Sequence, residues 1–435
     1  MKIAYIAAGA ADMYCGSCLH DNTLAGALQK MGHDVALIPT YTPMRTDAPS
    51  VSLDRVFFGA LNVYLQQKAA AFRHTPGALD RLLDQPGLIQ RAAKMGASTD
   101  PTALGDLTYS ILQGEEGFQA KELTKLVDWL RDDFRPDIVH LTNSMFAGFA
   151  RRLKQELGVP VVCSVQGEDL FMDQLREPWR TRVRELLAER ARDIDAFQVN
   201  SAWYADYMAD YMKCDRSRMF VVPLGLTLKG HDGQPPSLGK TGDHPFTVGY
   251  LARICPEKGL HVLVEAFHLL AGKMRLRVAG WLGERDRRYL EELESRIAGW
   301  GLSDSYERVG EVDREGKIRF LQSIDVLSVP TIYRDPKGLS VLEALANGVP
   351  VVQPRHGAFP EMIEATGGGL LVEPDSPEEL AHGIETLLRD PALRLELGRK
   401  GWEAVHSRFH DGAEAENTLR VYERLLAEPA RRASA

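Results

Sequence analysis

A loop in the second half of the chain carries two cations at a spacing that suits a diphosphate. Arg253 and Lys258 lie in the tract 249–259, between a predicted strand and a predicted helix. In an open α/β sheet such a loop lies at the carboxyl ends of the strands, where ligands bind. The planar guanidinium would hold phosphate oxygens in its fork, and the ammonium would add a mobile point charge. The alternative is a pair of solvated side chains at a loop, and this tract alone favours neither interpretation.

A second tract, 330–344, runs from a strand end through a turn into a helix. Asp335 before a proline is a turn signal, and Gly338 stands where backbone must approach a neighbour or a ligand closely. The first turn of a helix has unpaired N–H groups that attract anions. Here these groups belong to Gly338, Leu339 and Ser340.

Asp335 and Glu343 are eight residues apart, the first before this helix and the second inside it. Each carboxylate can accept two hydrogen bonds from a diol, and a ribose and a hexose both offer diols. The tract therefore predicts a site for phosphate or sugar oxygens. The alternative is that Asp335 caps the helix and that Glu343 forms an ordinary surface ion pair.

The elements that must position these residues alternate between strand and helix along the whole chain. In the first half we predict a helix at 19–31 and strands at 2–8, 35–39, 138–141, 159–165, 196–200 and 220–223. In the second half we predict strands at 246–251, 275–280, 326–330 and 349–353, and helices at 259–271, 286–300, 338–347, 377–389 and 391–405. The pattern predicts two doubly wound, parallel-sheet α/β domains, 1–225 and 246–407, joined by a glycine- and proline-rich linker at 226–245.

The bulk composition excludes several classes of protein. The chain has 435 residues and a net charge of −8. We do not expect it to bind nucleic acid generally, because counterion release needs a basic surface. Its five cysteines do not suggest a disulfide framework, and we find no secretory signal and no apolar run of membrane-spanning length. We therefore expect a cytoplasmic protein, and the sequence indicates no oligomeric state.

Two features of the first half allow more than one interpretation. Cys15 and Cys18 form a Cys-x-x-Cys pair, which can be a redox pair or half of a zinc site. We favour small side chains beside a phosphate-binding loop, because no second such pair is present. The segment 55–96 has six Lys and Arg residues against two Asp residues. We interpret it as a packed helical insertion, and the alternative is contact with an anionic membrane surface.

The motifs of the second half resemble those of the retaining group 1 glycosyltransferases, which have the GT-B fold. Asp335-Pro-Lys-Gly-Leu is followed by Ser-Val-Leu-Glu-Ala-Leu-Ala-Asn-Gly-Val-Pro-Val-Val352. The family pattern is a carboxylate, then Pro-x-Gly-Leu, then Leu-Glu-Ala-x-Ala-x-Gly-x-Pro-Val-Val. The tracts 249–259, 357–361 and 367–372 fit the family as well. The resemblance covers essentially the whole chain and is most specific in the second half.

The resemblance implies a fold and an activity. Two Rossmann-like domains would face each other across a cleft, with the acceptor on the first domain and the donor on the second. The C-terminal helix, within 408–435, would return to the first domain. The enzyme would move a sugar from a nucleotide-sugar to a hydroxyl acceptor with retention of configuration. It would need neither a metal nor a cofactor.

The resemblance also assigns roles to individual residues. Arg253 and Lys258 would hold the donor diphosphate, Glu343 would hold the ribose hydroxyls, and Asp335 would contact hydroxyls of the donor sugar. Arg308 and Val309 would lie near the base, and the residues closing over the phosphates would be Gly16 and Ser17. The backbone N–H groups would be those of Gly338, Leu339 and Ser340. The candidate catalytic residues are Arg253, Lys258, Asp335 and Gln166.

Two positions depart from the family pattern. Asp335 stands where the family has Glu, which predicts a different donor-sugar pocket. Gln166 stands where the family has the His of a His-Gly-x-Asp turn, and a glutamine amide takes up no proton at neutral pH. The departing diphosphate itself would then accept the acceptor's proton, and catalysis would rest on positioning and electrostatics.

Two other functions on the same fold stay open at this point. A sugar-nucleotide epimerase would need no acceptor. A non-catalytic nucleotide-sugar-binding protein would bind the donor without turnover and would tolerate the changes at Asp335 and Gln166. The sequence identifies neither the base nor the sugar of the donor, nor the acceptor.

Overall fold

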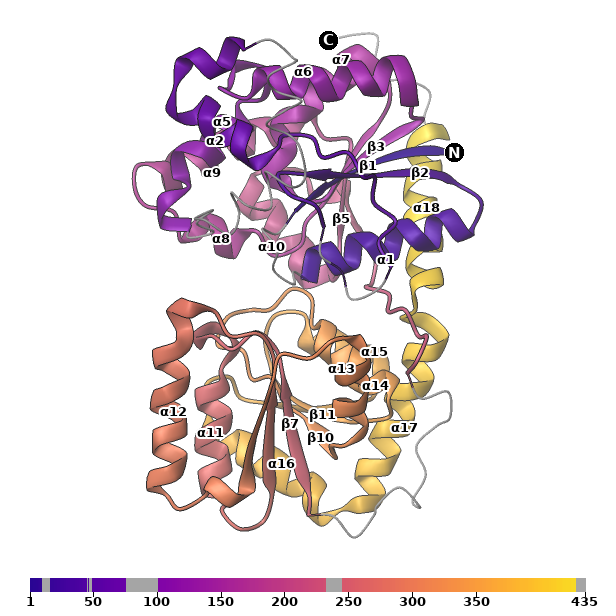
Figure 1. Cartoon of the computed structure of the whole chain (residues 1–435). Helices are drawn as coiled ribbons and strands as arrows, with labels where there is room; N and C mark the ends of the chain where they lie inside the picture. The colour runs from indigo at the N-terminus through magenta and orange to yellow at the C-terminus, as the bar shows by residue number, and fades with distance from the viewer. Residues whose placement is uncertain (10–15, 45, 47–48, 76–100, 232–244, 428–435) are drawn as a thin grey trace. The chain divides into compact units, whose positions relative to one another are not determined.

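The computed structural model describes residues 1–9, 16–44, 46, 49–75, 101–231 and 245–427, which form two compact units (Figure 1). Unit 1 comprises Met1–Gly225 and the chain from Asp411 onward, and unit 2 comprises Leu226–His410. The helix that follows unit 2 in the sequence, α18 (Asp411–Ala427), therefore belongs to unit 1. It packs there against α1 (Gly16–Lys30).

The described part of unit 1 is built on a parallel sheet of six strands in the order β2-β1-β3-β4-β5-β6. The strands are β1 (Lys2–Ala8), β2 (Asp34–Thr40), β3 (Ile138–Leu141), β4 (Val161–Ser164), β5 (Ala196–Val199) and β6 (Met219–Val221). Most of their side chains are buried on both faces, as expected for a parallel sheet covered by helices.

Helices cover both faces of this sheet. One face packs on α1 and α18, around a core that includes Ile3, Tyr5 and Tyr422. The other face packs on a larger core that includes Val139, Phe149 and Phe197. The other helices in the described part of unit 1 are α2 (Ala60–Lys68), α5 (Gly105–Leu112), α6 (Ala120–Trp129), α7 (Ala150–Leu157), α8 (Asp169–Asp173), α9 (Trp179–Arg190) and α10 (Ala202–Met212).

The described part of unit 2 has a second parallel sheet of six strands, in the order β12-β11-β10-β7-β8-β9. Its strands are β7 (Thr247–Leu251), β8 (Arg275–Ala279), β9 (Tyr306–Gly310), β10 (Val326–Leu327), β11 (Val351–Pro354) and β12 (Gly369–Val372). Its helices are α11 (Leu260–Leu269), α12 (Arg287–Gly299), α13 (Arg314–Gln322), α14 (Leu339–Ala346), α15 (Phe359–Thr366), α16 (Pro377–Arg389) and α17 (Pro391–Arg408). The predicted α/β class with two doubly wound sheets is confirmed.

Several predicted bounds were wrong. The strand expected at 326–330 has only two residues, Val326 and Leu327, because the chain leaves the sheet three residues before Pro330. Strand β9 was not predicted, since its sequence Tyr-Glu-Arg-Val-Gly is that of a half-exposed edge strand. The predicted linker and the basic segment 55–96 lie partly outside the described residues. Within the described part of that segment the chain forms α2.

The strand orders place one switch point in each sheet. In unit 1 the chain runs from β1 to β2 on one side and returns to β3 on the other. In unit 2 it runs from β7 to β8 and β9, and returns to β10 on the other side. Ligands of doubly wound proteins bind outside the carboxyl ends of the strands at such points. The loops after β7 and β10 are the tracts with the candidate residues of unit 2.

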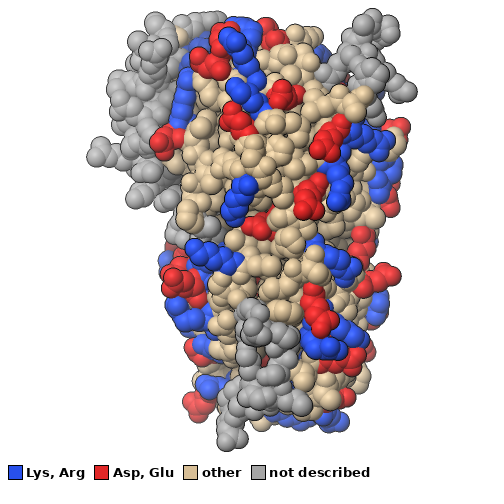
Figure 2. All heavy atoms as spheres, turned by 90° about the vertical axis from the view of Figure 1, so that its right-hand side faces the viewer, with Lys and Arg blue, Asp and Glu red and all other residues tan. Residues whose placement is uncertain are grey.

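The surface carries charges of both signs. On the face shown in Figure 2, Lys and Arg side chains lie among Asp and Glu side chains rather than in one extended patch. Ion pairs such as Lys30–Asp411 (3.6 Å) and Arg420–Glu416 (3.9 Å) are examples of this mixing. Among the described residues, no helix is long and apolar enough to cross a membrane.

Candidate active site

Two glycines allow close backbone approaches to the loop after β10 in unit 2, Gly259 from the loop after β7 and Gly357 from the loop after β11. Gly259 has φ +70°, and a side chain there would collide with the carbonyl oxygen of Pro330. Gly357 has φ +62°, and a side chain there would collide with the backbone of Asp335. A hydrogen bond from the N–H of Ile332 to the carbonyl oxygen of Glu257 (3.0 Å) also joins the two loops. The loop after β7 and the tract before α14 are therefore in direct contact.

This contact brings Lys258 and Asp335 into a buried ion pair. The ammonium of Lys258 donates to Oδ2 of Asp335 (2.6 Å) and to the hydroxyl of Tyr333 (2.7 Å), which itself donates to the same carboxylate oxygen (3.0 Å). Burial alone would raise the pKa of Asp335, but the charge of Lys258 outweighs burial and lowers it to about 2. Both partners are therefore charged at neutral pH.

The other oxygen of Asp335 caps the approach to α14. Oδ1 accepts hydrogen bonds from the backbone N–H groups of Lys337 (2.9 Å) and Gly338 (3.3 Å). The expectation that Gly338 offers a free donor was thus wrong, because Asp335 already uses it. The first turn of α14 still leaves the N–H groups of Leu339 and Ser340 without an intrahelical acceptor.

Glu343 forms a buried ion pair inside unit 2. It lies on α14 with 5% of its surface exposed, and its Oε1 is 2.5 Å from Nζ of Lys317 on α13. The alternative of an ordinary surface ion pair was therefore wrong. A buried pair holds the carboxylate in one place, and the paired carboxylate retains lone pairs for a further donor.

The remaining candidate residues of unit 2 lie outside this cluster. Arg253 follows β7 and is exposed, and its guanidinium donates to the sulfur of Cys255 (3.3 Å). Arg308 and Val309 lie on the edge strand β9, beyond β8 from β7, and the guanidinium of Arg308 is 4.0 Å from Glu294. The described contacts connect none of the three with Lys258, so their roles stay predictions.

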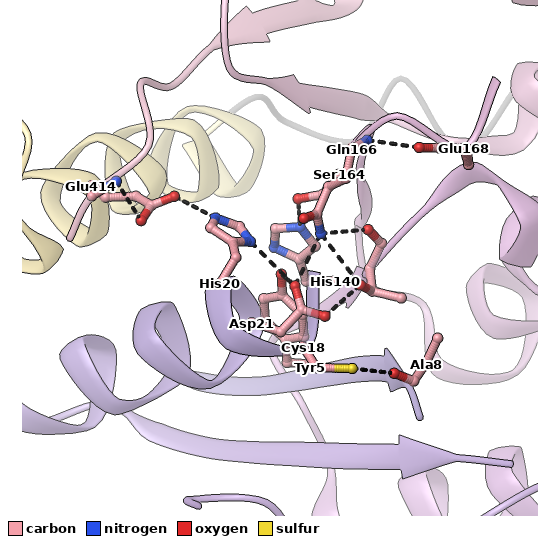
Figure 3. A network of polar contacts seen from close by, with 12 residues as sticks. Tyr5, Ala8, Cys18, His20, Asp21, His140, Ser164, Gln166, Glu168 and Glu414 are labelled. Carbon is pink, nitrogen blue, oxygen red and sulfur yellow. Dashed lines mark hydrogen bonds and ion pairs between the residues drawn. The ribbon is translucent and has the colours of Figure 1, made fainter. Parts of the chain in front are cut away.

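Gln166 lies in unit 1, at the carboxyl end of β4, in a buried polar network (Figure 3). Its side-chain nitrogen donates to Oδ1 of Asp21 (3.0 Å) and to the carbonyl oxygen of Thr142 (2.9 Å). Its backbone N–H donates to Glu168 (2.7 Å), whose other oxygen accepts from the N–H and hydroxyl of Ser144 (2.8 and 2.6 Å). These contacts lock the loops after β3 and β4 to each other and to α1.

A histidine continues the network to the C-terminal helix. His20 on α1 lies between Asp21 (3.3 Å) and Glu414 on α18 (2.5 Å). Burial alone would lower the pKa of His20, but the two carboxylates outweigh burial and raise it to about 9. The second oxygen of Glu414 accepts from the N–H of Gly225 (2.9 Å). A charged imidazole thus connects the start of α1 with the C-terminal helix.

The structure places Gly16 and Ser17 at the first turn of α1, where Gly16 is exposed. The loop before them, with Cys15, lies outside the described residues. Cys18 is buried, and its thiol donates to the carbonyl oxygen of Ala8 (3.2 Å). This contact is of the kind expected for a packed side chain.

Sequence reasoning missed the partners that hold the candidate residues. Of these partners, Tyr333 was the easiest to identify from the sequence, since it precedes Asp335 by two residues. The partners of Lys317, Asp21 and Glu414 are distant in the sequence, so local spacing did not indicate these pairs. Polar residues at buried positions of an otherwise apolar helix face, such as His20, Asp21 and Asn22 beside Leu24 and Leu28 of α1, are the signal that was available.

Comparisons with known proteins cover both units. Residues 237–403 match the model described as glycosyl transferases group 1, and residues 22–225 match the glycosyl transferase 4-like domain. An MMP alpha-(1->4)-mannosyltransferase of Mycolicibacterium hassiacum is 28% identical over 68% of this chain and 72% of that protein. An uncharacterized glycosyltransferase of Methanocaldococcus jannaschii is 28% identical over 43% of this chain, but only 46% of that protein is matched.

A solved structure supports the same fold. The crystal structure of HepE from Anabaena in complex with UDP-glucose has a TM-score of 0.65 and 16% identity, covering 98% of this chain and 100% of that one. The family models together match most of the chain, one on each unit. The chain therefore belongs to the group 1 glycosyltransferases and has their two-domain GT-B fold.

Proposed function

We propose that this glycosyltransferase takes its sugar from a nucleotide-sugar, transfers it to a hydroxyl acceptor with retention, and needs no metal. The observation that supports this most is the cluster of Lys258, Asp335 and the start of α14 at the switch point of unit 2. HepE, whose complexes contain UDP and UDP-glucose, has the same fold. A nucleoside diphosphate linked to a hexose is the donor class that we infer for this chain.

Lys258 is poised to bind an anion. An ammonium has three N–H donors, and two of them are used by Tyr333 and Asp335. The third is available for a phosphate oxygen. The first-turn N–H groups of Leu339 and Ser340, which have no acceptor within the helix, would bind the same anion at the N-terminus of α14, where the helix dipole adds to the attraction. The guanidinium of exposed Arg253 would approach from the loop after β7.

The ribose would bind at Glu343. Its carboxylate is buried and paired with Lys317 on one side, which leaves it able to accept hydrogen bonds from one diol. Arg308 and Val309 remain the proposed neighbours of the base. The acceptor would bind to unit 1, near Gln166, Gly16 and Ser17.

Charge neutralisation by the chain itself supports metal independence. The departing diphosphate would be stabilised by Lys258, Arg253 and the N-terminus of α14, so a divalent cation has no separate task in this scheme. Retention would follow if the diphosphate oxygen accepts the acceptor's proton on the face that it leaves. Gln166 cannot perform this proton transfer, because an amide is not a base at neutral pH.

Asp335→Asn should separate binding of the nucleotide from transfer of the sugar. The asparagine oxygen can still cap Lys337 and Gly338, but the negative charge beside Lys258 is removed. We expect affinity for UDP or GDP to rise about 3- to 10-fold, and sugar transfer to fall about 10-fold or more. Isothermal titration calorimetry measures the affinity for the nucleotide, and the rate of product formation measures sugar transfer. A loss of nucleotide affinity would show that Asp335 only maintains the loop.

The proposed function is tested by binding and products together. Thermal shifts with UDP, GDP, ADP and their hexose conjugates identify the donor, since a bound nucleotide raises stability by mass action. With that donor and a panel of sugar acceptors, we expect an α-linked product from an α-linked donor, at a rate unchanged by EDTA. An inverted anomer or an EDTA-sensitive rate would contradict the mechanism. Binding without turnover would favour a non-catalytic nucleotide-sugar-binding protein, and an epimerised donor would favour an epimerase.

A further inference from the structure

The neighbours of Gln166 hold its side-chain amide in one orientation. The nitrogen donates to the carboxylate of Asp21 and to the carbonyl oxygen of Thr142, so both of its N–H groups are used (Figure 3). If the amide were turned over, its oxygen would face these two acceptors. Two hydrogen bonds would then be replaced by contacts between lone pairs. The contacts therefore determine that the nitrogen faces Asp21 and that the oxygen faces away.

The oxygen that faces away has no partner among the described residues. Oε1 of Gln166 is buried, and the whole residue is only 6% exposed. Strand β5 is the neighbour of β4, and just after it lies a second buried polar atom without a partner among the described residues, Nδ2 of Asn200. Buried polar groups in folded proteins are nearly always paired, and an unpaired one calls for an explanation. A bound hydroxyl group would supply the missing donor to Oε1.

Asp21 is itself rigidly held in the charged form. It is completely buried, and it accepts hydrogen bonds from the hydroxyls of Tyr5 (2.9 Å) and Thr142 (2.5 Å). Burial would raise its pKa, but the contact with the His20 imidazolium outweighs burial and lowers it. An ionised carboxylate can only accept hydrogen bonds, so it always selects the nitrogen end of the Gln166 amide.

We propose that Asp21 is a positioning residue, which fixes the amide of Gln166 so that the amide oxygen accepts a hydrogen bond from a hydroxyl group of a sugar substrate. The proposal rests on the proposed function only for the identification of the ligand as a sugar. A substrate that lacks this hydroxyl would leave the buried oxygen unpaired and would be rejected. The hydroxyl belongs either to the donor sugar or to the acceptor, and the experiments below distinguish the two.

The orientation is tested without any substrate. In Asp21→Asn the neighbour can present either end of its own amide, so only the carbonyl oxygen of Thr142 still selects the nitrogen end of the Gln166 amide and its orientation is held less firmly. By NMR of ¹⁵N-glutamine-labelled protein, the two side-chain amide hydrogens of Gln166 should exchange with solvent about 10- to 100-fold faster than in the wild type. Gln166→Glu, which lacks the signal, identifies the resonance. Unchanged exchange in Asp21→Asn would overturn the proposal.

Asn22→Asp is the matched control. Asn22 is the next residue on α1 and is 4% exposed, but it contacts the backbone of Pro49 and Val51 instead of Gln166. Its replacement perturbs a buried polar contact on the same helix, and we expect no change in the exchange of the Gln166 amide. Equal acceleration in both variants would show that loosening of α1, and not the carboxylate of Asp21, is responsible.

The role in catalysis is tested with UDP-glucose, GDP-mannose and ADP-glucose as donors. For any donor that the wild type uses, kcat/KM in Asp21→Asn should fall about 10- to 100-fold while affinity for the free nucleoside diphosphate stays within about twofold. Slower hydrolysis without acceptor assigns the hydroxyl to the donor sugar. Normal hydrolysis with slower transfer assigns it to the acceptor. Unchanged kcat/KM would overturn the proposal, whereas a wild type that uses none of the donors contradicts the proposed function and leaves the exchange test decisive.

Discussion

Lys258→Met should lower kcat/KM for sugar transfer about 100- to 1,000-fold. The ammonium donates to Asp335 and Tyr333 at the start of the tract that leads into α14, and in the proposed function its third donor binds the diphosphate. Charge develops on the leaving diphosphate in the transition state, and removal of one preorganised donor to such a charge typically costs about 10²- to 10³-fold. The loss should appear in kcat as well as in affinity for the nucleotide.

The same substitution also leaves a buried carboxylate without its cation. Asp335 would retain its contacts with Tyr333, Lys337 and Gly338, but its charge would no longer be compensated. The double variant Lys258→Met/Asp335→Asn removes this charge, so it should regain most of the stability lost in the single variant and none of the activity. Urea unfolding and steady-state kinetics on the three proteins check this pattern. If activity returned together with stability, Lys258 would be a structural residue.

The fold followed from the sequence because its signals are local. Runs such as Ile3–Ala7 and Val248–Leu251 are apolar enough to predict buried strands, and the glycines between them predict where the chain turns. The edge strand β9 was missed since an edge strand needs few apolar residues. The length of β10 was overestimated because the sequence does not show where a chain leaves a sheet.

The site was predictable to the extent that its residues follow strands. The positions of Arg253, Lys258 and Asp335 at the carboxyl ends of strands came from local pattern. Their pairing did not, since Lys258 and Asp335 are 77 residues apart and meet where Gly259 allows the backbone of their two loops to touch. The same holds for His20 and Glu414, which are 394 residues apart. Sequence spacing predicts which element carries a group, and packing decides which partner neutralises it.

In both units a buried carboxylate is held in the charged form by a cation and by neutral donors. Asp335 in unit 2 has Lys258 and two backbone N–H groups, and Asp21 in unit 1 has His20 and two hydroxyls. A buried charge that loses its partner is costly, which restricts the movement of every group in such a cluster. Each carboxylate thereby fixes a neighbouring group, the ammonium of Lys258 or the amide of Gln166.

His20→Leu should lower the free energy of unfolding at pH 6 by about 3 to 5 kcal/mol. The substitution leaves the buried carboxylates of Asp21 and Glu414 without the imidazolium between them, and breaking a buried pair in this way typically costs that much. The effect must depend on pH, because the pKa of His20 is raised to about 9 in the folded protein. Because this pKa is raised, protonation of His20 stabilises the folded state fully at a pH below the pKa in the unfolded chain, about 6.5. This stabilisation is lost as the pH rises through about 9.

The difference in the free energy of unfolding between the wild type and His20→Leu should therefore decrease by about 3 kcal/mol between pH 6 and pH 10. His140→Asn is the matched control, since His140 is another completely buried histidine of unit 1, bonded to Tyr422 (2.5 Å) and Ser164 (2.7 Å). Burial lowers the pKa of His140 to about 3, so it is neutral in the folded protein throughout this range, whereas in the unfolded chain it still binds a proton at pH 6; the cost of its replacement should therefore rise by about 1 kcal/mol between pH 6 and pH 10, opposite to the change for His20→Leu. Urea unfolding followed by circular dichroism measures both differences. If the cost of His20→Leu did not fall between pH 6 and pH 10, His20 would be a neutral hydrogen-bonding residue, and Asp21 would need another source of charge compensation.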